Sequence, residues 1–182
     1  MIQLQPMNLV MPLIELEPYP DAVNESERAV HLVDIENLLG SSDITPGAVR
    51  RVRGQYDIVA GVTVTDHLII ATGPTAAPAA WFGWGSARRL LGRGIDGADR
   101  ALLAVIEAER LAARFSRVVI ASGDGIFAEA SAALQAGGCQ VTVVTRPGSL
   151  STRLRLAVRD VRYLYDSVPV PPLSLNGLRR AA

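Results

Sequence analysis

Short apolar runs rich in β-branched residues alternate along this chain with stretches that carry apolar residues at helical spacing. The runs predict strands at residues 29–33, 67–71, 118–121, 141–144 and 161–165, with a smaller strand at 88–91. The other stretches predict a helix that starts at Thr45-Pro46, with Val49, Val52 and Tyr56 on one side, and helices at 75–85, 98–114, 127–135 and 149–158. Alternation of this kind implies parallel strand pairing and right-handed crossovers. We therefore expect a three-layer α/β/α sandwich with a mainly parallel, Rossmann-like central sheet.

The length of 182 residues suffices for one domain with a sizeable core. We assign residues 27–166 to this domain, residues 1–26 to an extended, proline-rich N-terminal arm and residues 167–182 to a C-terminal tail. No basic segment precedes the apolar part of the arm, and prolines interrupt it, so we predict neither a signal peptide nor a membrane span. We expect the arm to dock on the domain or on a partner, a second copy of the chain included.

Carboxylates follow two of the predicted strands. Asp34 comes directly after the strand at 29–33, and Asp124 ends the small-residue turn after the strand at 118–121. If these strands are parallel neighbours, both side chains emerge at one edge of the sheet, where open parallel sheets bind ligands. Asp99 lies in the first turn of the predicted helix at 98–114, and Asp96 lies in the turn before it. Helix capping explains Asp96 as well as a functional role does.

Carboxylates that meet in one cleft repel each other and take up protons unless a cation compensates. Mg²⁺ and Mn²⁺ prefer oxygen ligands and keep several bound waters. Such an ion can activate a water molecule and stabilise the charge on a phosphate undergoing displacement. We therefore predict a Mg²⁺ or Mn²⁺ site formed by Asp34, Asp96, Asp99 and Asp124.

The composition excludes several kinds of chemistry. The chain contains no lysine, so its 18 basic residues are all arginine, and they balance 18 acidic residues. The absence of lysine excludes a P-loop lysine, a Schiff-base lysine and the lysine of haloacid-dehalogenase-type phosphatases. Zero net charge gives no overall attraction to nucleic acid, so any such binding depends on a local arginine patch. The single cysteine, Cys139, favours a reducing cytoplasm and is interpreted as a small buried residue.

Histidine and aromatic residues offer few alternatives to the carboxylates. The two histidines, His31 and His67, both lie in apolar strands, where a role in the core is the better explanation. The aromatic group of residues 81–84 is suited to stacking on RNA bases, but packing over the sheet explains it better. Arg93 precedes the acidic turn and is a candidate for contact with phosphate.

Three blocks of sequence, in this order, resemble the signature blocks of NYN domains, which belong to the PIN-like superfamily of metal-dependent ribonucleases. The blocks are Val33-Asp34-Ile35-Glu36-Asn37, Gly97-Ala98-Asp99-Arg100-Ala101-Leu102 and Ala121-Ser122-Gly123-Asp124-Gly125-Ile126-Phe127. The resemblance extends over residues 29–165. It implies a Rossmann-like sheet, Mg²⁺ or Mn²⁺ at an acidic cleft and hydrolysis of single-stranded or structured RNA.

Carried over to this sequence, the resemblance implies that Asp34, Asp99 and Asp124 are the catalytic metal ligands. It implies substrate-binding roles for Asn37, Ser122 and Gly123, to which the position of Arg93 adds a fourth candidate. Glu36 is interpreted as solvated or locally paired, and Asp160 as structural.

Many NYN domains carry a second acid two residues after the aspartate of the last block, where this chain has Ile126. We accordingly expect a cytoplasmic metal-dependent ribonuclease that binds RNA and no membrane. The alternative is an NYN module that binds RNA or a nucleotide without cutting it. A third interpretation is an interaction protein whose proline-rich ends recruit a partner.

Overall fold

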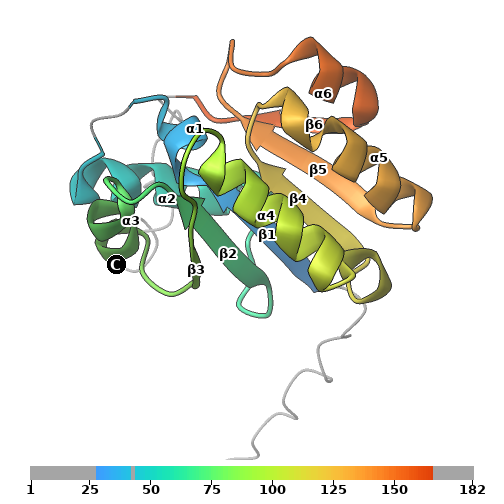
Figure 1. Cartoon of the computed structure of the whole chain (residues 1–182), viewed down its shortest axis with the longest axis horizontal. Helices are drawn as coiled ribbons and strands as arrows, with labels where there is room; N and C mark the ends of the chain where they lie inside the picture. Colours follow the sequence, from blue (N-terminus) through green and yellow to red (C-terminus); the bar gives the residue numbers. More distant parts are fainter. Residues whose placement is uncertain (1–27, 42–43, 166–182) are drawn as a thin grey trace, which may run out of the picture.

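The structure is a computed structural model that describes residues 28–41 and 44–165, and its centre is a six-stranded sheet in the order β3-β2-β1-β4-β5-β6. The strands are β1 (Ala29–Asp34), β2 (His67–Thr72), β3 (Arg88–Leu91), β4 (Arg117–Ala121), β5 (Gln140–Thr145) and β6 (Asp160–Tyr163). Every neighbouring pair is parallel. Figure 1 shows the strands side by side at the centre of the molecule. The four central strands are buried along most of their length, as their continuous apolar composition requires.

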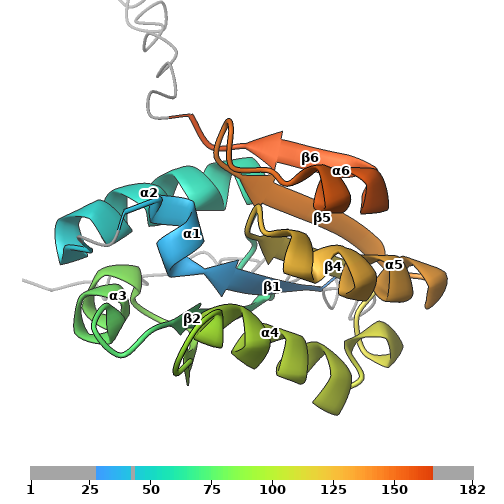
Figure 2. The ribbon, with the colours of Figure 1, turned by 45° about the horizontal axis from the view of Figure 1, so that its top comes forward.

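Helices cover both faces of this sheet (Figure 2). One face packs against α1 (Ile35–Leu39), α2 (Pro46–Ala60) and α3 (Ala77–Trp84). The other packs against α4 (Gly97–Ala108), α5 (Ala128–Ala136) and α6 (Thr152–Ala157), with 3₁₀ turns η2 (Leu111–Ala113) and η3 (Gly125–Phe127). The predicted three-layer α/β/α architecture is therefore confirmed. The arm at 1–26 and the tail at 167–182 lie outside the described residues.

The helix starts follow local chemistry. Thr45 caps α2 by accepting a hydrogen bond from the backbone N–H of Ala48 at 3.2 Å, and Pro46 occupies the first turn. Ser151 caps α6 in the same way through the N–H of Leu154. None of the helices within the described ranges has the length and apolar character that crossing a bilayer requires.

Three helices differ from the prediction. The helix expected over 149–158 runs from Thr152 to Ala157, because Ser151 is its N-cap. The helix expected over 98–114 ends at Ala108, because Arg110 has a φ of 51° and begins a separate 3₁₀ turn. The helix α1 was not predicted, since five residues are too few for a recognisable period. It starts directly after the last residue of β1, so the chain turns sharply at the strand end.

The histidines and aromatic residues divide between core and surface. His31 is completely buried, as predicted, whereas the core position predicted for His67 is wrong: it is exposed at the start of β2, and its ring edge meets Phe115. Packing explains Trp84, which is buried against Tyr56.

Trp81 is half-buried, but Phe82 is 76% exposed, so the prediction of packing over the sheet is wrong for that residue. Cys139 is buried, as expected.

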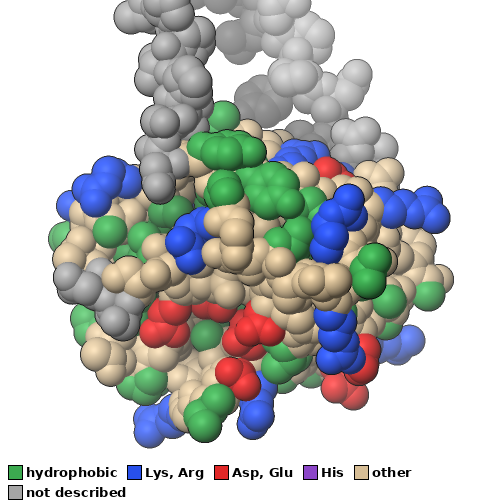
Figure 3. All heavy atoms as spheres, turned by 90° about the horizontal axis from the view of Figure 1, so that it is seen from above, with side chains coloured by type: hydrophobic (Ala, Val, Ile, Leu, Met, Phe, Trp, Pro, Cys, Tyr) green, Lys and Arg blue, Asp and Glu red, His purple; other side chains and the backbone are tan. Residues whose placement is uncertain are grey.

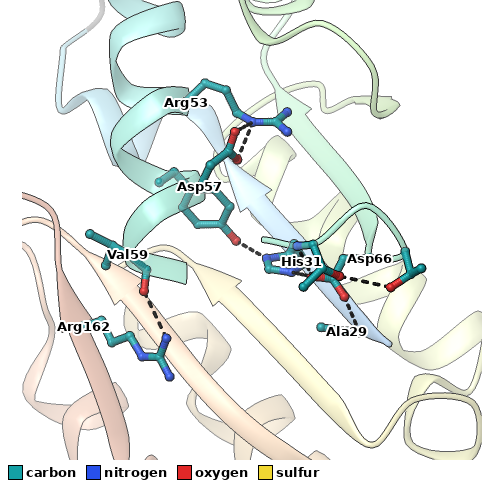
Figure 4. Close-up of polar contacts among 10 residues, drawn as sticks. Ala29, His31, Arg53, Asp57, Val59, Asp66 and Arg162 are labelled. Carbon is teal, nitrogen blue, oxygen red and sulfur yellow. Dashed lines mark hydrogen bonds and ion pairs between the residues drawn. The ribbon is translucent and has the colours of Figure 1, made fainter. Parts of the chain in front are cut away.

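A buried polar network fastens the amino-terminal end of the sheet (Figure 4). The Nδ1 atom of His31 lies 2.7 Å from the Tyr56 hydroxyl, and Nε2 lies 3.3 Å from Asp66 Oδ2. The Asp66 carboxylate also accepts hydrogen bonds from the N–H groups of Ala29 and Thr63, both at 2.8 Å. A neutral ring satisfies both neighbours when Nε2–H donates to Asp66 and Nδ1 accepts from Tyr56.

Burial lowers the pKa of His31, although the Asp66 carboxylate opposes this shift. The neutral ring is therefore the form that the fold selects. A proton taken up by the unfolded chain below its ordinary pKa of 6.5 reduces the stability of the fold, so the network favours folding above that pH.

We predict that Tyr56→Phe lowers the free energy of unfolding by about 1–3 kcal/mol, because it leaves Nδ1 of His31 buried without a donor. Urea denaturation measures the change. Tyr163→Phe is the matched control: the ring of Tyr163 touches Tyr165, and its hydroxyl makes no hydrogen bond to a described residue, so stability should change by less than about 0.5 kcal/mol. Equal losses in the two variants would contradict the assigned network.

Candidate active site at the carboxyl edge of the sheet

The parallel pairing of β1 and β4 places the ends of both strands at one edge of the sheet. Val33 lies opposite Ala121 in the register, so Asp34 and the turn Ser122-Gly123-Asp124 follow at the same level. The prediction that these strands are parallel neighbours is confirmed. Figure 3 views the molecule from this edge and shows acidic side chains gathered in the middle of the face, with basic side chains around them.

Asp34 is fixed by the helix that it starts. Its Oδ1 atom accepts hydrogen bonds from the N–H groups of Glu36 and Asn37, at 3.1 and 3.2 Å. This is N-capping by a carboxylate, and it holds the side chain in one orientation. Only 5% of Asp34 is exposed. Burial raises its pKa, and the hydrogen bonds from the backbone oppose that rise.

Asp99 is brought to Asp34 by the first turn of α4. It is 7% exposed, and its Oδ1 atom is buried without a hydrogen-bond partner among the described residues. Burial, the negative charge of Asp34 and a hydrogen bond between the two carboxyl groups raise the pKa of Asp99 to about 8. The charges of Asp124 and Asp96 add to this rise. At neutral pH the two carboxyls therefore share a proton where no cation is present.

A pocket of about 230 Å³ lies beside this carboxyl pair. Four carboxylates and four glycines contribute to its lining: Asp34, Glu36, Asp96, Asp99, Gly73, Gly92, Gly94 and Gly97. The backbones at Gly92 and Gly97 come so close that a Cβ atom on either residue would clash with the other. The glycine walls leave room for a ligand to approach the backbone.

Asn37, Ser122 and Gly123 form the hydrogen-bonded wall between β1 and β4. The Oδ1 atom of Asn37 accepts from the N–H of Gly123 at 2.9 Å, and the Ser122 hydroxyl accepts from the N–H of Asp124 at 3.2 Å. A Cβ atom on Gly123 would clash with the carbonyl of Ser149. Asn37 lines the pocket, whereas Ser122 is completely buried behind it. The polar contacts of Asn37 and Ser122 are thus with the protein backbone.

Asp124 is exposed and caps η3, with its Oδ1 atom accepting from the N–H of Ile126 at 2.9 Å. It does not line the pocket of Asp34 and Asp99. The side chain of Ile126 packs against the core beneath α4 and α5. Asp96 is exposed at the rim with a φ of 53°, and its side chain makes no cap hydrogen bond. Arg93 is exposed in the same loop and does not line the pocket.

Within residues 28–41 and 44–165, no group of three or more acidic, histidine or cysteine side chains is arranged to hold a metal ion. The carboxylates that the structure places in contact are the pair Asp34 and Asp99. Two carboxylates in contact suit a cation that takes few of its ligands from the protein. Mg²⁺ is commonly bound by one or two carboxylates, with water and substrate phosphates completing its coordination.

Sequence reasoning underrated Glu36. Its carboxylate spans from α1 to the loop after β2, where Oε2 accepts from the N–H of Gly73 at 3.1 Å. It therefore lines the pocket and closes one wall. The available signal was the Gly-Pro pair at 73–74, which marks a sharp turn directly after a buried strand.

The comparisons with known proteins bear on the fold and give no information on function. A crystal structure of a protein of unknown function from Vibrio parahaemolyticus is similar to this chain, with a TM-score of 0.55 and 18% identity. The match covers 80% of this chain and 97% of that one. Comparison with family models and with curated proteins finds no match. The chain thus has a parallel α/β fold with an acidic pocket at its carboxyl edge, and its chemistry has to be argued from that pocket.

We predict that Asp99→Asn raises the melting temperature at pH 8 in EDTA. Because the pKa of about 8 in the folded state exceeds the ordinary aspartate value of 3.8, the folded state binds more protons between these values and loses stability as the pH rises. Removing the charge should raise Tm by at least about 2–4 °C, which corresponds to about 1 kcal/mol in a chain of this size. Differential scanning fluorimetry should show the gain shrinking toward pH 4.

Asp160→Asn is the control, since Asp160 lies outside the pocket and accepts hydrogen bonds from Thr142 and Arg162. It should bring no gain at pH 8. A gain for Asp99→Asn that is constant with pH would contradict the proposed proton sharing.

Gly123→Ala should destabilise the fold by about 1–3 kcal/mol, because its Cβ atom would collide with the backbone of Ser149. Gly54→Ala is the matched change in the middle of α2, where nothing lies within 4 Å, and it should stabilise the fold by about 0.5–1 kcal/mol. Urea denaturation distinguishes these opposite signs. A stabilising Gly123→Ala would show that the turn is not closely packed.

Proposed function

We propose that this protein is a metal-dependent ribonuclease of the NYN type that hydrolyses RNA phosphodiesters at the acidic pocket. One observation carries the proposal: the buried Oδ1 atom of Asp99, without a hydrogen-bond partner among the described residues, beside the carboxylate of Asp34. An acceptor of this kind is costly to leave unpaired unless a ligand satisfies it. A divalent cation is the ligand that relieves both the missing partner and the repulsion between the carboxylates.

Asp34 and Asp99 are the residues that would hold the ion, and Asp96 at the rim is near enough to add negative charge. When bound, Mg²⁺ or Mn²⁺ supplies an activated water and neutralises charge on the phosphate. Asp124 contributes through its charge, which already acts on Asp99, rather than from the lining of the pocket. The donor set consists of oxygen atoms alone and matches the preference of these ions.

The remaining residues of the site orient the carboxylates and give the substrate access to them. The N–H groups of Glu36 and Asn37 fix one oxygen of Asp34, so its carboxylate keeps one orientation toward Asp99. Asn37 ties α1 to the turn after β4, so both strand ends keep a constant separation. The glycine walls allow a phosphodiester backbone to approach the carboxylates without obstruction by side chains.

A second candidate function is RNA binding without cleavage. Ile126, where many NYN domains carry an acid, packs into the core, and the pocket offers two carboxylates in contact rather than three. We also propose a cytoplasmic location, which the single, unpaired cysteine favours.

We predict cleavage of a labelled single-stranded RNA by the purified chain in Mn²⁺ and none in EDTA. Asp34→Asn and Asp99→Asn should each lower the rate about 100-fold or more, since even residues that only orient metal ligands cost 10–100-fold. Asp160→Asn removes a carboxylate outside the pocket and should keep the wild-type rate. Gel electrophoresis of the products measures the rates.

Thermal shift gives an independent readout of cation binding. Mn²⁺ should raise the Tm of the wild type at pH 8 and leave that of Asp99→Asn unchanged. Cleavage that persists in both pocket variants would assign the activity to a contaminant. RNA binding in EDTA with no product after long incubation in Mn²⁺ would select the binding module instead.

A further inference from the structure

A second depression, here called the arginine groove, borders the last residues of α1, whereas the acidic pocket borders its first residues. The arginine groove has a volume of about 410 Å³, within the range of small-molecule sites. Its lining includes two arginines, the polar side chain of Gln55 and several apolar side chains, among them Leu38, Leu39, Val52 and Leu164. These residues come from α1, α2 and the ends of β5 and β6, and α1 and α2 lie side by side in Figure 2.

Arg146 is held at the end of α1. Its Nε atom donates to the carbonyl of Asn37 at 3.2 Å, and its guanidinium stands over Gly40, where any Cβ atom would clash with it. Gly40 has a φ of 61° and closes the helix. Neither Nη1 nor Nη2 of Arg146 makes a hydrogen bond to a residue that the structure describes. The guanidinium group of Arg146 is therefore held in one orientation, while Nη1 and Nη2 can donate hydrogen bonds to a ligand.

Arg51 provides the second cation from α2. It is exposed and makes no hydrogen bond or ion pair with any described residue. Arg53, two residues along the same helix, shows the contrast, because its Nε atom lies 2.6 Å from the carboxylate of Asp57. No described residue that lines the groove carries a carboxylate. Two cations in one depression, with no carboxylate among the described lining residues, favour an anionic ligand.

We infer that the arginine groove binds one nucleotide of a single-stranded RNA, with Arg51 and Arg146 on phosphate and the apolar floor against the base or ribose. Guanidinium groups bind phosphate through paired hydrogen bonds, and apolar side chains accept an unstacked base. A single strand is required, because a base has to turn out of the helix to reach the floor.

This inference rests on the proposed function, since it supplies that site with its substrate contact. Asn37 lines the acidic pocket, and the next residue, Leu38, lines the groove. In this inference, a strand seated in the groove runs past α1 toward the pocket. The negative pocket repels RNA by itself, so a cationic groove beside it accounts for how the substrate is held.

Fluorescence anisotropy of a labelled single-stranded RNA in EDTA tests the groove without cleavage. Arg51→Gln and Arg146→Gln should each raise Kd about 10-fold and lower the slope of log Kd against log salt by about 1. Arg155→Gln is the matched control: it removes the same charge from an exposed position on α6 that does not line the groove, and should leave Kd within about 2-fold. The thermal midpoint of Arg146→Gln checks that α1 stays folded.

A second assay distinguishes a wrong assignment of the arginine groove from a wrong proposed function of the acidic pocket. Hydrolysis of bis-p-nitrophenyl phosphate in Mn²⁺ by the wild type tests the acidic pocket without the groove and should be unchanged in Arg155→Gln. The KM of Arg51→Gln for RNA should rise about 10-fold. Absence of hydrolysis together with weakened RNA binding in both groove variants would reject the nuclease and keep the groove.

Wild-type Kd in both groove variants, equal weakening in Arg155→Gln, or no RNA binding by the wild type would overturn the inference. A dimer that Arg51→Gln dissociates while RNA binding is unchanged would assign the groove to a second copy of the chain and also overturn it.

Discussion

The parallel pairing of β1 and β4 at the centre of the sheet is the constraint on which the site depends. Its register sets Val33 against Ala121, so the chain leaves both strands at one level and turns at once into α1 and η3. Each turn is capped by a carboxylate, Asp34 in one case and Asp124 in the other. The close approach of the glycine backbones at 92 and 97 then delivers the start of α4, and with it Asp99, to the same edge. A shift of one residue in this pairing would turn every side chain of β1 to the opposite face.

The two edges of the sheet differ in how completely their buried polar atoms are hydrogen-bonded. At the amino-terminal edge, the network of Tyr56, His31 and Asp66 satisfies every buried polar atom that takes part in it. At the carboxyl edge, Asp99 keeps an oxygen without a partner among the described residues and a raised pKa. Proteins retain such unfavourable arrangements where a ligand relieves them, and stability gained elsewhere offsets the cost. The buried carboxylate oxygen of Asp99 without a hydrogen-bond partner, rather than the number of acidic residues, distinguishes the candidate site from ordinary surface charge.

The short helix α1 separates two environments of opposite charge. Its first residues face the acidic pocket through Glu36 and Asn37, and its last residues border the arginine groove through Leu38 and Leu39. Arg146 joins the two sides by donating to the carbonyl of Asn37, whose side chain in turn accepts from Gly123. The proposed cation site and the proposed phosphate site lie at the two ends of one helix, which suits a substrate that carries a phosphodiester in an extended strand. The proposals for the pocket and for the groove thus share a single structural element.

The sequence alone determined the layered parallel fold, because buried strands and amphipathic helices leave a local periodic record. It also determined that Thr45 caps the start of α2. The position of Asp34 and Asp124 at the same edge of the sheet followed as well, since neighbouring parallel strands align their ends. It did not determine α1, which is too short to show a period, or the contact of Glu36 with Gly73 across 37 residues. The burial of Asp99 and its proton sharing with Asp34 likewise depend on how α4 packs against β1. Distances between side chains on separate elements arise only when the layers pack, so the tertiary structure alone decided which carboxylates meet.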